Sequence, residues 1–207
     1  MRLAPTAGVV AALALLTGCG GGGTNPNAPA LPSYDADALA AAAIQHLDKN
    51  GSGTAEDAEL DAAPGLKLAL GEIDANKDEK LSADELKARF ARYADGAAGG
   101  GLAAVSCTVY LDNAPVPNAT VRFEPEPFMA SVLKPATGTT DAQGFVNVKV
   151  DGSADYGVFP GVYRIVVTRD GGKDLPARYN TKTTLGREVF GGSRSASGGI
   201  ELRLKSG

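Results

Sequence analysis

The chain has 207 residues and a formal net charge of −4, with 20 basic against 24 acidic side chains. An acidic chain of this kind is not suited to nucleic acid, whose phosphates attract basic surfaces. One histidine and two cysteines exclude a zinc site built from several thiolates and imidazoles, and they exclude a multi-disulfide scaffold. The 27 glycines predict small modules joined by flexible segments.

The chain begins with a predicted signal peptide, residues 1–18. Arg2 precedes an apolar run from Ala7 to Leu16 that is too short to remain in a bilayer as a spanning helix. The sequence from Leu16 to Cys19 resembles the bacterial lipoprotein signal, in which the peptidase cuts before a cysteine that then carries lipid. This resemblance implies lipidation at Cys19 and an extracytoplasmic protein anchored to the membrane. Gly20 is not the aspartate associated with inner-membrane retention, which favours the outer membrane where a cell has two.

Composition divides the remaining chain into four segments. Residues 19–33 are mostly small residues and prolines that cannot bury a core, which predicts a flexible tether. Residues 34–95 are rich in Ala, Leu and charge and favour helices, whereas residues 102–207 alternate and favour strands. The glycine-rich stretch 96–101 between them is predicted to be a linker. Residues 33–95 hold 14 acidic and 7 basic side chains, so the acidity of the chain is concentrated in the helical segment.

Two stretches of the helical segment, 48–59 and 74–85, place oxygen-bearing residues at alternate positions. Calcium takes hard oxygen ligands, and a twelve-residue loop supplies them from positions 1, 3, 5, 7, 9 and 12. Both stretches resemble the EF-hand calcium loop, which implies a structural Ca²⁺ site in each. The first site would use the side chains of Asp48, Asn50, Ser52, Glu56 and Glu59 and the carbonyl of Thr54. The second would use the side chains of Asp74, Asn76, Asp78, Ser82 and Glu85 and the carbonyl of Lys80.

Each loop departs once from the strict EF-hand pattern. In the first loop, Ser52 places a short neutral oxygen at position 5. In the second loop, Glu79 replaces the glycine at position 6, where a left-handed backbone costs a non-glycine residue about 1 to 2 kcal/mol. Unless that strain is relieved, the second loop should bind more weakly or distort. The position-8 residues, Ala55 and Leu81, are expected to meet in a short strand contact.

Apolar residues at helical spacing flank both loops and predict helices with one buried face. Ser82 and Glu85 have the spacing of a capping box at the start of the last helix. The loops are close together, so the inner helices must be short and the core small enough to depend on metal. The apolar positions are Leu39, Ala43 and Leu47, then Leu66, Ala69, Leu70 and Ile73, then Leu86, Phe90 and Tyr93.

The segment from 102 to 207 predicts an antiparallel β-sandwich. Apolar and polar residues alternate from Val105 to Asp112, as in a strand with one buried face, and Cys107 therefore points inward as a core thiol. Further short strands are separated by turns rich in Gly, Pro, Asp and Asn. These strands are expected at 119–124, 145–150, 162–168, 183–189 and 200–204.

Four blocks of this segment carry a second resemblance: 110–123, 138–145, 157–165 and 175–180. They resemble the carboxypeptidase regulatory-like (transthyretin-like) domain, in versions seen in bacterial lipoproteins, planctomycete ones especially. The resemblance implies an antiparallel Ig-like or prealbumin-like sandwich that follows the EF-hand pair, and hence a multidomain α + β protein. These blocks are folding signals, and the several active-site histidines of transthyretin-like hydrolases have no counterpart in a chain whose only histidine is His46.

The sequence favours a non-enzymatic, calcium-binding, lipid-anchored envelope protein whose sandwich serves adhesion, spacing or assembly. Its partner would be an unidentified envelope protein or glycan, and no nucleic acid. An alternative is glycan or cell-wall binding by the sandwich, in a groove formed by the loop 125–135 or on aromatic residues such as Phe128 and Phe159, with a degenerate, purely structural EF-hand pair. A third hypothesis is hydrolysis by the carboxylates of Glu124 and Glu126, for which a solvated strand end is the simpler interpretation.

Overall fold

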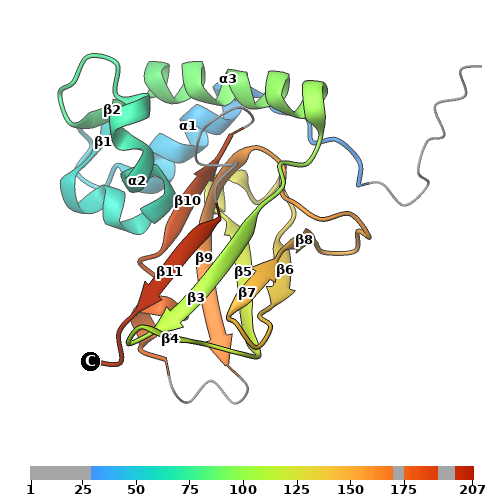
Figure 1. The fold of residues 1–207 in the computed structure, drawn as a ribbon. Helices are drawn as coiled ribbons and strands as arrows, with labels where there is room; N and C mark the ends of the chain where they lie inside the picture. The colour runs from blue at the N-terminus through green and yellow to red at the C-terminus, as the bar shows by residue number, and fades with distance from the viewer. Residues whose placement is uncertain (1–28, 170–174, 191–198) are drawn as a thin grey trace, which may run out of the picture.

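The computed structural model describes residues 29–169, 175–190 and 199–207 (Figure 1). The predicted signal peptide, the lipidation site Cys19 and the first part of the predicted tether lie outside these residues. Helices gather at one end of the molecule, and strands form the rest (Figure 1). The predicted mixed α + β class is therefore confirmed.

The helix module, residues 34–100, contains two helix–loop–helix units joined by a short ladder. Asp35 caps the first helix by accepting the N–H of Ala38 at 3.0 Å, and Pro64 begins α2, where its missing N–H costs nothing. The elements in chain order are α1 (Ala36–Leu47), β1 (Thr54–Glu56), the 3-10 helix η1 (Asp57–Ala62), α2 (Pro64–Ile73), β2 (Lys80–Ser82) and α3 (Ala83–Gly100).

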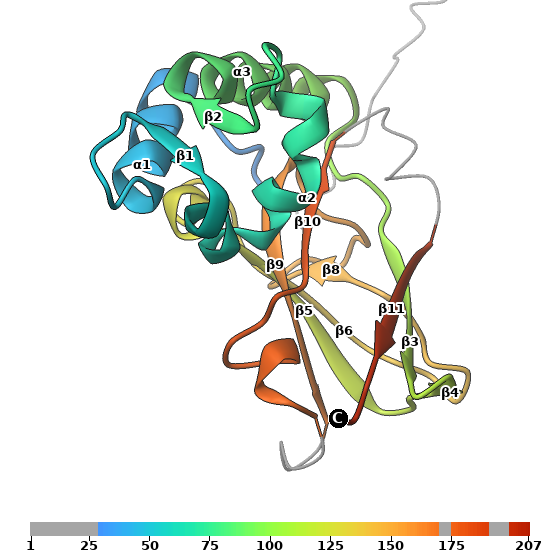
Figure 2. The same cartoon turned by 90° about the vertical axis from the view of Figure 1, so that its left-hand side faces the viewer.

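The sheet module, residues 103–207, forms two sheets within the described residues. The five-stranded sheet has the order β10-β9-β5-β6-β8, and the second sheet pairs β3 with β11, β4 and β7. Figure 2 shows the two sheets as separate layers. The strands are β3 (Ser106–Leu111), β4 (Ala114–Pro115), β5 (Ala119–Pro125), β6 (Ala136–Thr139), β7 (Phe145–Asn147), β8 (Lys149–Val150), β9 (Gly161–Arg169), β10 (Gly186–Val189) and β11 (Ile200–Leu204), with the 3-10 helices η2 (Pro127–Met129) and η3 (Ala177–Tyr179).

One strand pair departs from the antiparallel prediction: β3 and β11 are parallel, with Val109 opposite Leu202. The direction of β10 explains this. In Figure 1, β10 runs toward the helix module, and β3 and β11 both run away from it. Strand β3 follows α3 and therefore also starts at that end. A strand that returns from there must run in the same direction as β3.

The predicted glycine linker 96–101 is largely helical. Helix α3 continues through Gly100 and ends at Gly101, where φ is +66°. Ala97 is buried one turn beyond the buried Tyr93, so side-chain packing extends the helix into a stretch of low helix propensity. The two modules are consequently joined by a helix and not by a flexible segment over most of this stretch.

The two modules share one continuous hydrophobic core. Phe90 of α3 stacks on Phe128 of η2 with ring centroids 6.1 Å apart, and buried residues of both modules form a single cluster. Gly65 of α2 lies against β9, where an added Cβ would be 2.6 Å from Val162 Cγ1. The helix module therefore covers one end of the outer face of the five-stranded sheet (Figure 2).

Candidate metal centre

The first loop begins where α1 ends, at Asp48. The chain turns through Gly51 and Gly53, whose φ angles are +76° and +86°. This turn directs successive backbone N–H groups at the Asp48 carboxylate: Gly51 donates to Oδ1 at 2.7 Å, Ser52 to Oδ1 at 3.1 Å, and Gly53 to Oδ2 at 2.8 Å. The carboxylate at position 1 is thus fixed at the centre of the loop.

The last predicted ligand of this loop, Glu59, reaches back to its start. Its Oε1 accepts the N–H groups of Lys49 at 2.7 Å and Asn50 at 3.2 Å. Glu59 also forms a capping box with Glu56 at the start of η1. Local capping therefore brings the carboxylates of positions 1 and 12 to the same short stretch of backbone.

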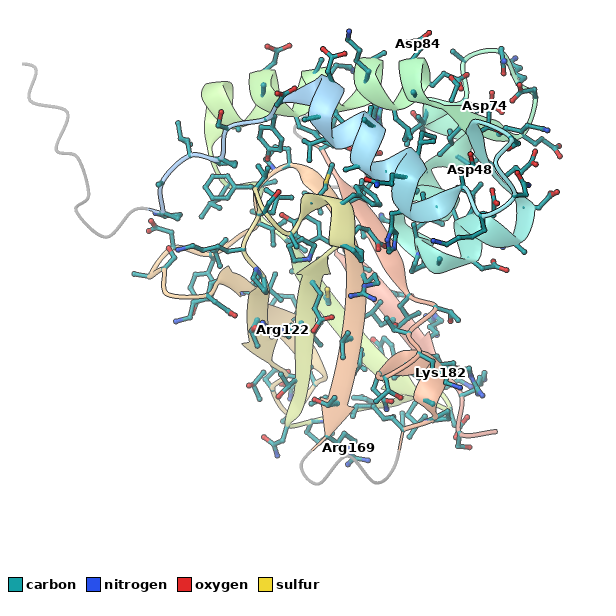
Figure 3. The ribbon with its side chains drawn as sticks, turned by 180° about the vertical axis from the view of Figure 1, so that it is seen from behind. Asp48, Asp74, Asp84, Arg122, Arg169 and Lys182 are labelled. Carbon is teal, nitrogen blue, oxygen red and sulfur yellow. The ribbon has the colours of Figure 1, made fainter. Side chains whose placement is uncertain are left out.

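The second loop repeats this arrangement position by position. Asp74 ends α2, and its carboxylate accepts the N–H groups of Lys77 at 2.7 Å, Asp78 at 3.3 Å and Glu79 at 2.8 Å. Glu85 Oε1 accepts the N–H groups of Ala75 at 3.0 Å and Asn76 at 3.4 Å. Asp48 and Asp74 lie at the same end of the helix module (Figure 3).

The expected distortion at position 6 of the second loop is absent. Lys77 and Glu79 adopt φ angles of +62° and +64°, in the same left-handed region as Gly51 and Gly53 at the equivalent positions. The second loop therefore keeps the backbone path of the first. The left-handed conformation costs about 1 to 2 kcal/mol at Glu79, because this residue has a Cβ where the first loop has a glycine.

A short antiparallel ladder joins the two loops. Ala55 pairs with Leu81, as predicted from their position in each loop, and both side chains are fully buried. The flanking pairs are Thr54 with Ser82 and Glu56 with Lys80. The predicted carbonyl ligands of Thr54 and Lys80 therefore belong to β1 and β2, whose separation the ladder fixes.

The remaining predicted ligands make hydrogen bonds within their loops. Asn50 Oδ1 accepts the N–H of Ser52 at 2.8 Å, and Asn76 Oδ1 accepts the N–H of Asp78 at 3.0 Å. The Asn50 amide donates to Glu56 at 3.1 Å, and the Asn76 amide donates to Asp78 at 2.9 Å. The hydroxyl of Ser82 donates to Glu85 at 2.8 Å and caps α3, the predicted capping box.

The local electrostatics keep several of these carboxylates ionised. Hydrogen bonds, that from Gly53 first, lower the pKa of Asp48. The ion pair across the ladder lowers the pKa of Glu56 and raises that of Lys80. Burial acts to raise the pKa of Glu85, but hydrogen bonds from Ser82, Ala75 and Asn76 outweigh it, and the net shift is downward.

The donor set of both loops consists of oxygen atoms, which is the set that Ca²⁺ prefers. Within the described residues, no three His, Cys, Asp or Glu side chains are grouped so that they could hold a metal ion by themselves. Amide, hydroxyl and carbonyl oxygens supply half of each predicted set, and the other half is three carboxylates, which the structure does not bring into one such group: Asp48, Glu56 and Glu59 in the first loop, and Asp74, Asp78 and Glu85 in the second. The chemistry of the donors therefore fits a calcium ion bound by mixed ligands.

Outside the loops, the structure buries several of the other residues singled out from the sequence. Cys107 is fully buried, as predicted, and burial raises the pKa of its thiol to about 12. His46 is half-buried beside Phe128, with ring centroids 6.4 Å apart. Burial, then Lys49 and Arg164, lower its pKa. Phe128 and Phe159 are each only 5% exposed, so neither offers a stacking surface to a sugar.

The interpretation of Glu124 and Glu126 as a solvated strand end is wrong for Glu126. Its side chain is fully buried under α2, and neither carboxylate oxygen has a hydrogen-bond partner. The nearest cation is Arg164, with Nε 3.8 Å from Oε2. Burial raises the pKa of Glu126 to about 8, while Arg164 and the backbone of Gly65 act in the opposite direction. A carboxylate sealed from solvent does not contact a substrate, so this arrangement gives the hydrolysis hypothesis no support.

Sequence reasoning missed a second carboxylate, Glu188 of β10. It accepts the Nε and Nη2 groups of Arg89 at 2.5 and 2.6 Å, and the hydroxyl of Tyr93 at 2.5 Å. Both partners lie about 100 positions earlier in the sequence, on α3. No local pattern signals this contact, because only the packing of α3 on the sheet brings the residues together.

Comparison with known protein families, with curated proteins and with solved structures found no match to this chain. Among the helices that the structure describes, none is both long and apolar enough to cross a membrane.

Proposed function

We propose that this chain is a calcium-binding, lipid-anchored protein of the cell envelope, in which the helix module is an EF-hand pair. One observation supports the calcium assignment most strongly. Two loops of different sequence repeat the same left-handed positions and the same N–H contacts to their first and last carboxylates. An acidic surface loop would have no reason to repeat such geometry twice, with the position-8 residues paired.

Both loops would hold Ca²⁺ through the ligands predicted from the sequence. In the first loop, the chain keeps Asp48 and Glu59 on one short stretch of backbone; in the second, it does the same with Asp74 and Glu85. When bound, Ca²⁺ supplies positive charge that offsets the repulsion between these carboxylates. Its role here is structural, because the binding free energy adds to the free energy of folding.

Calcium titration of the full chain by calorimetry tests this assignment, with Glu59→Gln and Glu85→Gln as single-loop variants. We expect two binding events, of which each variant loses one, and much weaker binding of Mg²⁺, which does not favour a flexible site with a bidentate carboxylate. Helix content, followed by circular dichroism, should fall when a chelator is added. No binding heat and no change in helicity would overturn the proposal.

The lipid anchor rests on the sequence around Cys19, which lies outside the described residues. Expression of the full chain in a bacterium fed a labelled fatty acid tests it. Label should enter the wild-type protein and fractionate with membranes, whereas Cys19→Ser should carry no label and appear in the soluble fraction. Equal labelling of both proteins would remove the anchor from the proposal.

The sheet module is proposed to act without catalysis, as an adhesion, spacing or assembly element. Its support is chemical: within the described residues, the thiol of Cys107 and the carboxylate of Glu126 are both buried and therefore kept from solvent. One carboxylate of the pair considered for hydrolysis and the one thiol of the described residues thus lie in its interior.

A groove at the junction of the modules favours saccharide binding as a second candidate function. It has a volume of about 600 Å³ and is lined by residues of η1, β5, β9 and the 180–184 segment, in which Arg164, Thr168 and Lys182 lie among apolar residues such as Val166. Binding of cell-wall polysaccharide to the full chain, lost in Lys182→Ala and kept in Lys134→Ala, would support it. Equal binding by both variants would place any saccharide site elsewhere.

A further inference from the structure

The helices on the two sides of the second loop rest on the same strand of the sheet module. Helix α2, which delivers Asp74, meets β10 at Gly186, where an added Cβ would overlap the backbone of Pro64 and Gly65. Helix α3, which carries Glu85 in its first turn, meets β10 at Glu188 through Arg89 and Tyr93. Two residues of one strand thus set the separation of the helices that carry the first and last ligands of the second loop.

The Glu188 contact fixes α3 in more than one direction. Arg89 donates two hydrogen bonds to the two carboxylate oxygens, which fixes the angle between the groups as well as their distance. Tyr93, one turn further along α3, donates a third. All three side chains are at least nine-tenths buried, so water does not compete for these bonds.

The position of Arg89 in α3 links this contact to the metal loop. Arg89 lies four residues after Glu85, so one helical turn separates the buried ion pair from the predicted bidentate ligand. A helix is stiff over one turn, and a shift of Arg89 therefore moves Glu85 by a similar amount. The entering helix of the first loop, α1, packs on α3 as well, but its own contact with the sheet module is at η2 beside Phe128 and not at β10.

We propose that Glu188 is a positioning residue for the second calcium loop, acting through Arg89 to hold Glu85 at the distance from Asp74 that binding requires. This inference rests on the proposed calcium binding. It makes a strand some 100 residues further along the chain part of the metal site and assigns the sheet module a role in calcium affinity.

Calcium titration of the full chain tests the proposal in two backgrounds. Glu59→Gln leaves the second loop as the reporter, and Glu85→Gln leaves the first. Adding Glu188→Gln should weaken binding to the second loop by about tenfold and change binding to the first by less than about twofold, because its effect reaches Glu85 through Arg89 over one helical turn. Glu201→Gln is the matched control, because it removes an exposed carboxylate of β11 that pairs with Arg203.

A double-mutant cycle separates positioning from general destabilisation. In an Arg89→Met background, Glu188→Gln should cause little further loss of affinity, because the path through Arg89 is already removed. Tyr93→Phe removes a single hydrogen bond and serves as the milder variant, with an expected loss of about twofold to threefold confined to the second loop.

The outcomes are distinct. Unchanged affinity of the second loop in Glu188→Gln, or equal weakening of both loops in Tyr93→Phe, overturns the positioning role while calcium binding stands. Absence of binding in the wild-type chain overturns calcium binding itself. If Glu188→Gln loses its circular dichroism spectrum, Tyr93→Phe decides between positioning and a general role in folding.

Discussion

The two loops follow the same backbone path with different residues and different support. The first uses glycine at both left-handed positions, Gly51 and Gly53, and needs no help to make the turn. The second uses Lys77 and Glu79 there and carries a conformational cost. Its flanking helices, however, are held by β10 at Gly186 and Glu188. The conformational freedom of glycine allows the turn in the first loop. In the second loop, which lacks these glycines, contacts of the flanking helices with β10 compensate.

The largest expected effect concerns the buried carboxylate beneath α2, the helix that joins the two loops. Burial raises the pKa of Glu126 from 4.5 to about 8, so the folded protein favours the protonated form. The associated stability is fully present below pH 4.5 and is lost as the pH rises toward about 8. Between pH 5.5 and 8.5, the wild type should lose about 3 kcal/mol of unfolding free energy relative to Glu126→Gln.

Urea unfolding at the two pH values measures this difference. Glu124→Gln is the matched control, because Glu124 lies two residues away on the outer face and is a third exposed. We expect its pH dependence to follow the wild type. A wild-type pH dependence identical to that of Glu126→Gln would show that the buried carboxylate does not titrate in this range.

The second prediction disturbs the packing of α2 on the sheet module. Gly65→Ala would place a Cβ 2.6 Å from Val162 Cγ1 and 2.9 Å from the carbonyl oxygen of Tyr163. It should lower the unfolding free energy by about 1 to 3 kcal/mol and weaken both loops, because α2 follows one and precedes the other. Gly71→Ala, in the same helix with no atom within 4 Å, should instead stabilise by roughly 0.5 to 1 kcal/mol. Similar effects of the two substitutions would contradict the close contact with β9.

The third prediction exchanges the residues at position 6. Gly53→Ala should cost about 1 to 2 kcal/mol of unfolding free energy at saturating calcium, because φ there is left-handed. Glu79→Gly should gain roughly 0.5 to 1 kcal/mol, since relief of strain is partly offset by the greater freedom of glycine in the unfolded chain. Thermal unfolding of both variants measures the pair. A gain in both, or a loss in both, would show that the loops differ in backbone conformation.

The smallest expected effect comes from position 5, where the first loop has Ser52 and the second has Asp78. Ser52→Asp should raise the calcium affinity of the first loop by about fivefold at low salt, because it adds a charged ligand. Added salt should reduce the gain. Ser52→Asn, which lengthens the side chain without charge, is the control. An equal gain from asparagine would assign the effect to reach and not to charge.

Local sequence was enough to predict both loops and their flanking helices. Asp48, Asp74 and the Ser82–Glu85 capping box act on backbone within a few residues of themselves, and the Ala55–Leu81 pairing follows from the symmetry of the two loops. The strand around Cys107 was predictable for the same reason, since alternation specifies which side chains face inward. The strand Ala136–Thr139 was missed, because its composition is that of a turn and its neighbours in the sheet determine its pairing.

The sequence by itself determined most of the helix and strand segments and the candidate ligands, because these depend on interactions within about a dozen residues, although the predicted strand 145–150 is divided into β7 and β8 on different sheets. Only the tertiary structure decided the parallel pairing of β3 with β11, the helical extension of α3 to Gly100, the burial of Glu126 and the ion pair of Arg89 with Glu188. Each of these depends on how the helix module packs against the sheets. Packing joins residues more than 100 positions apart, such as Gly65 and Gly186, and no local periodicity encodes such a contact.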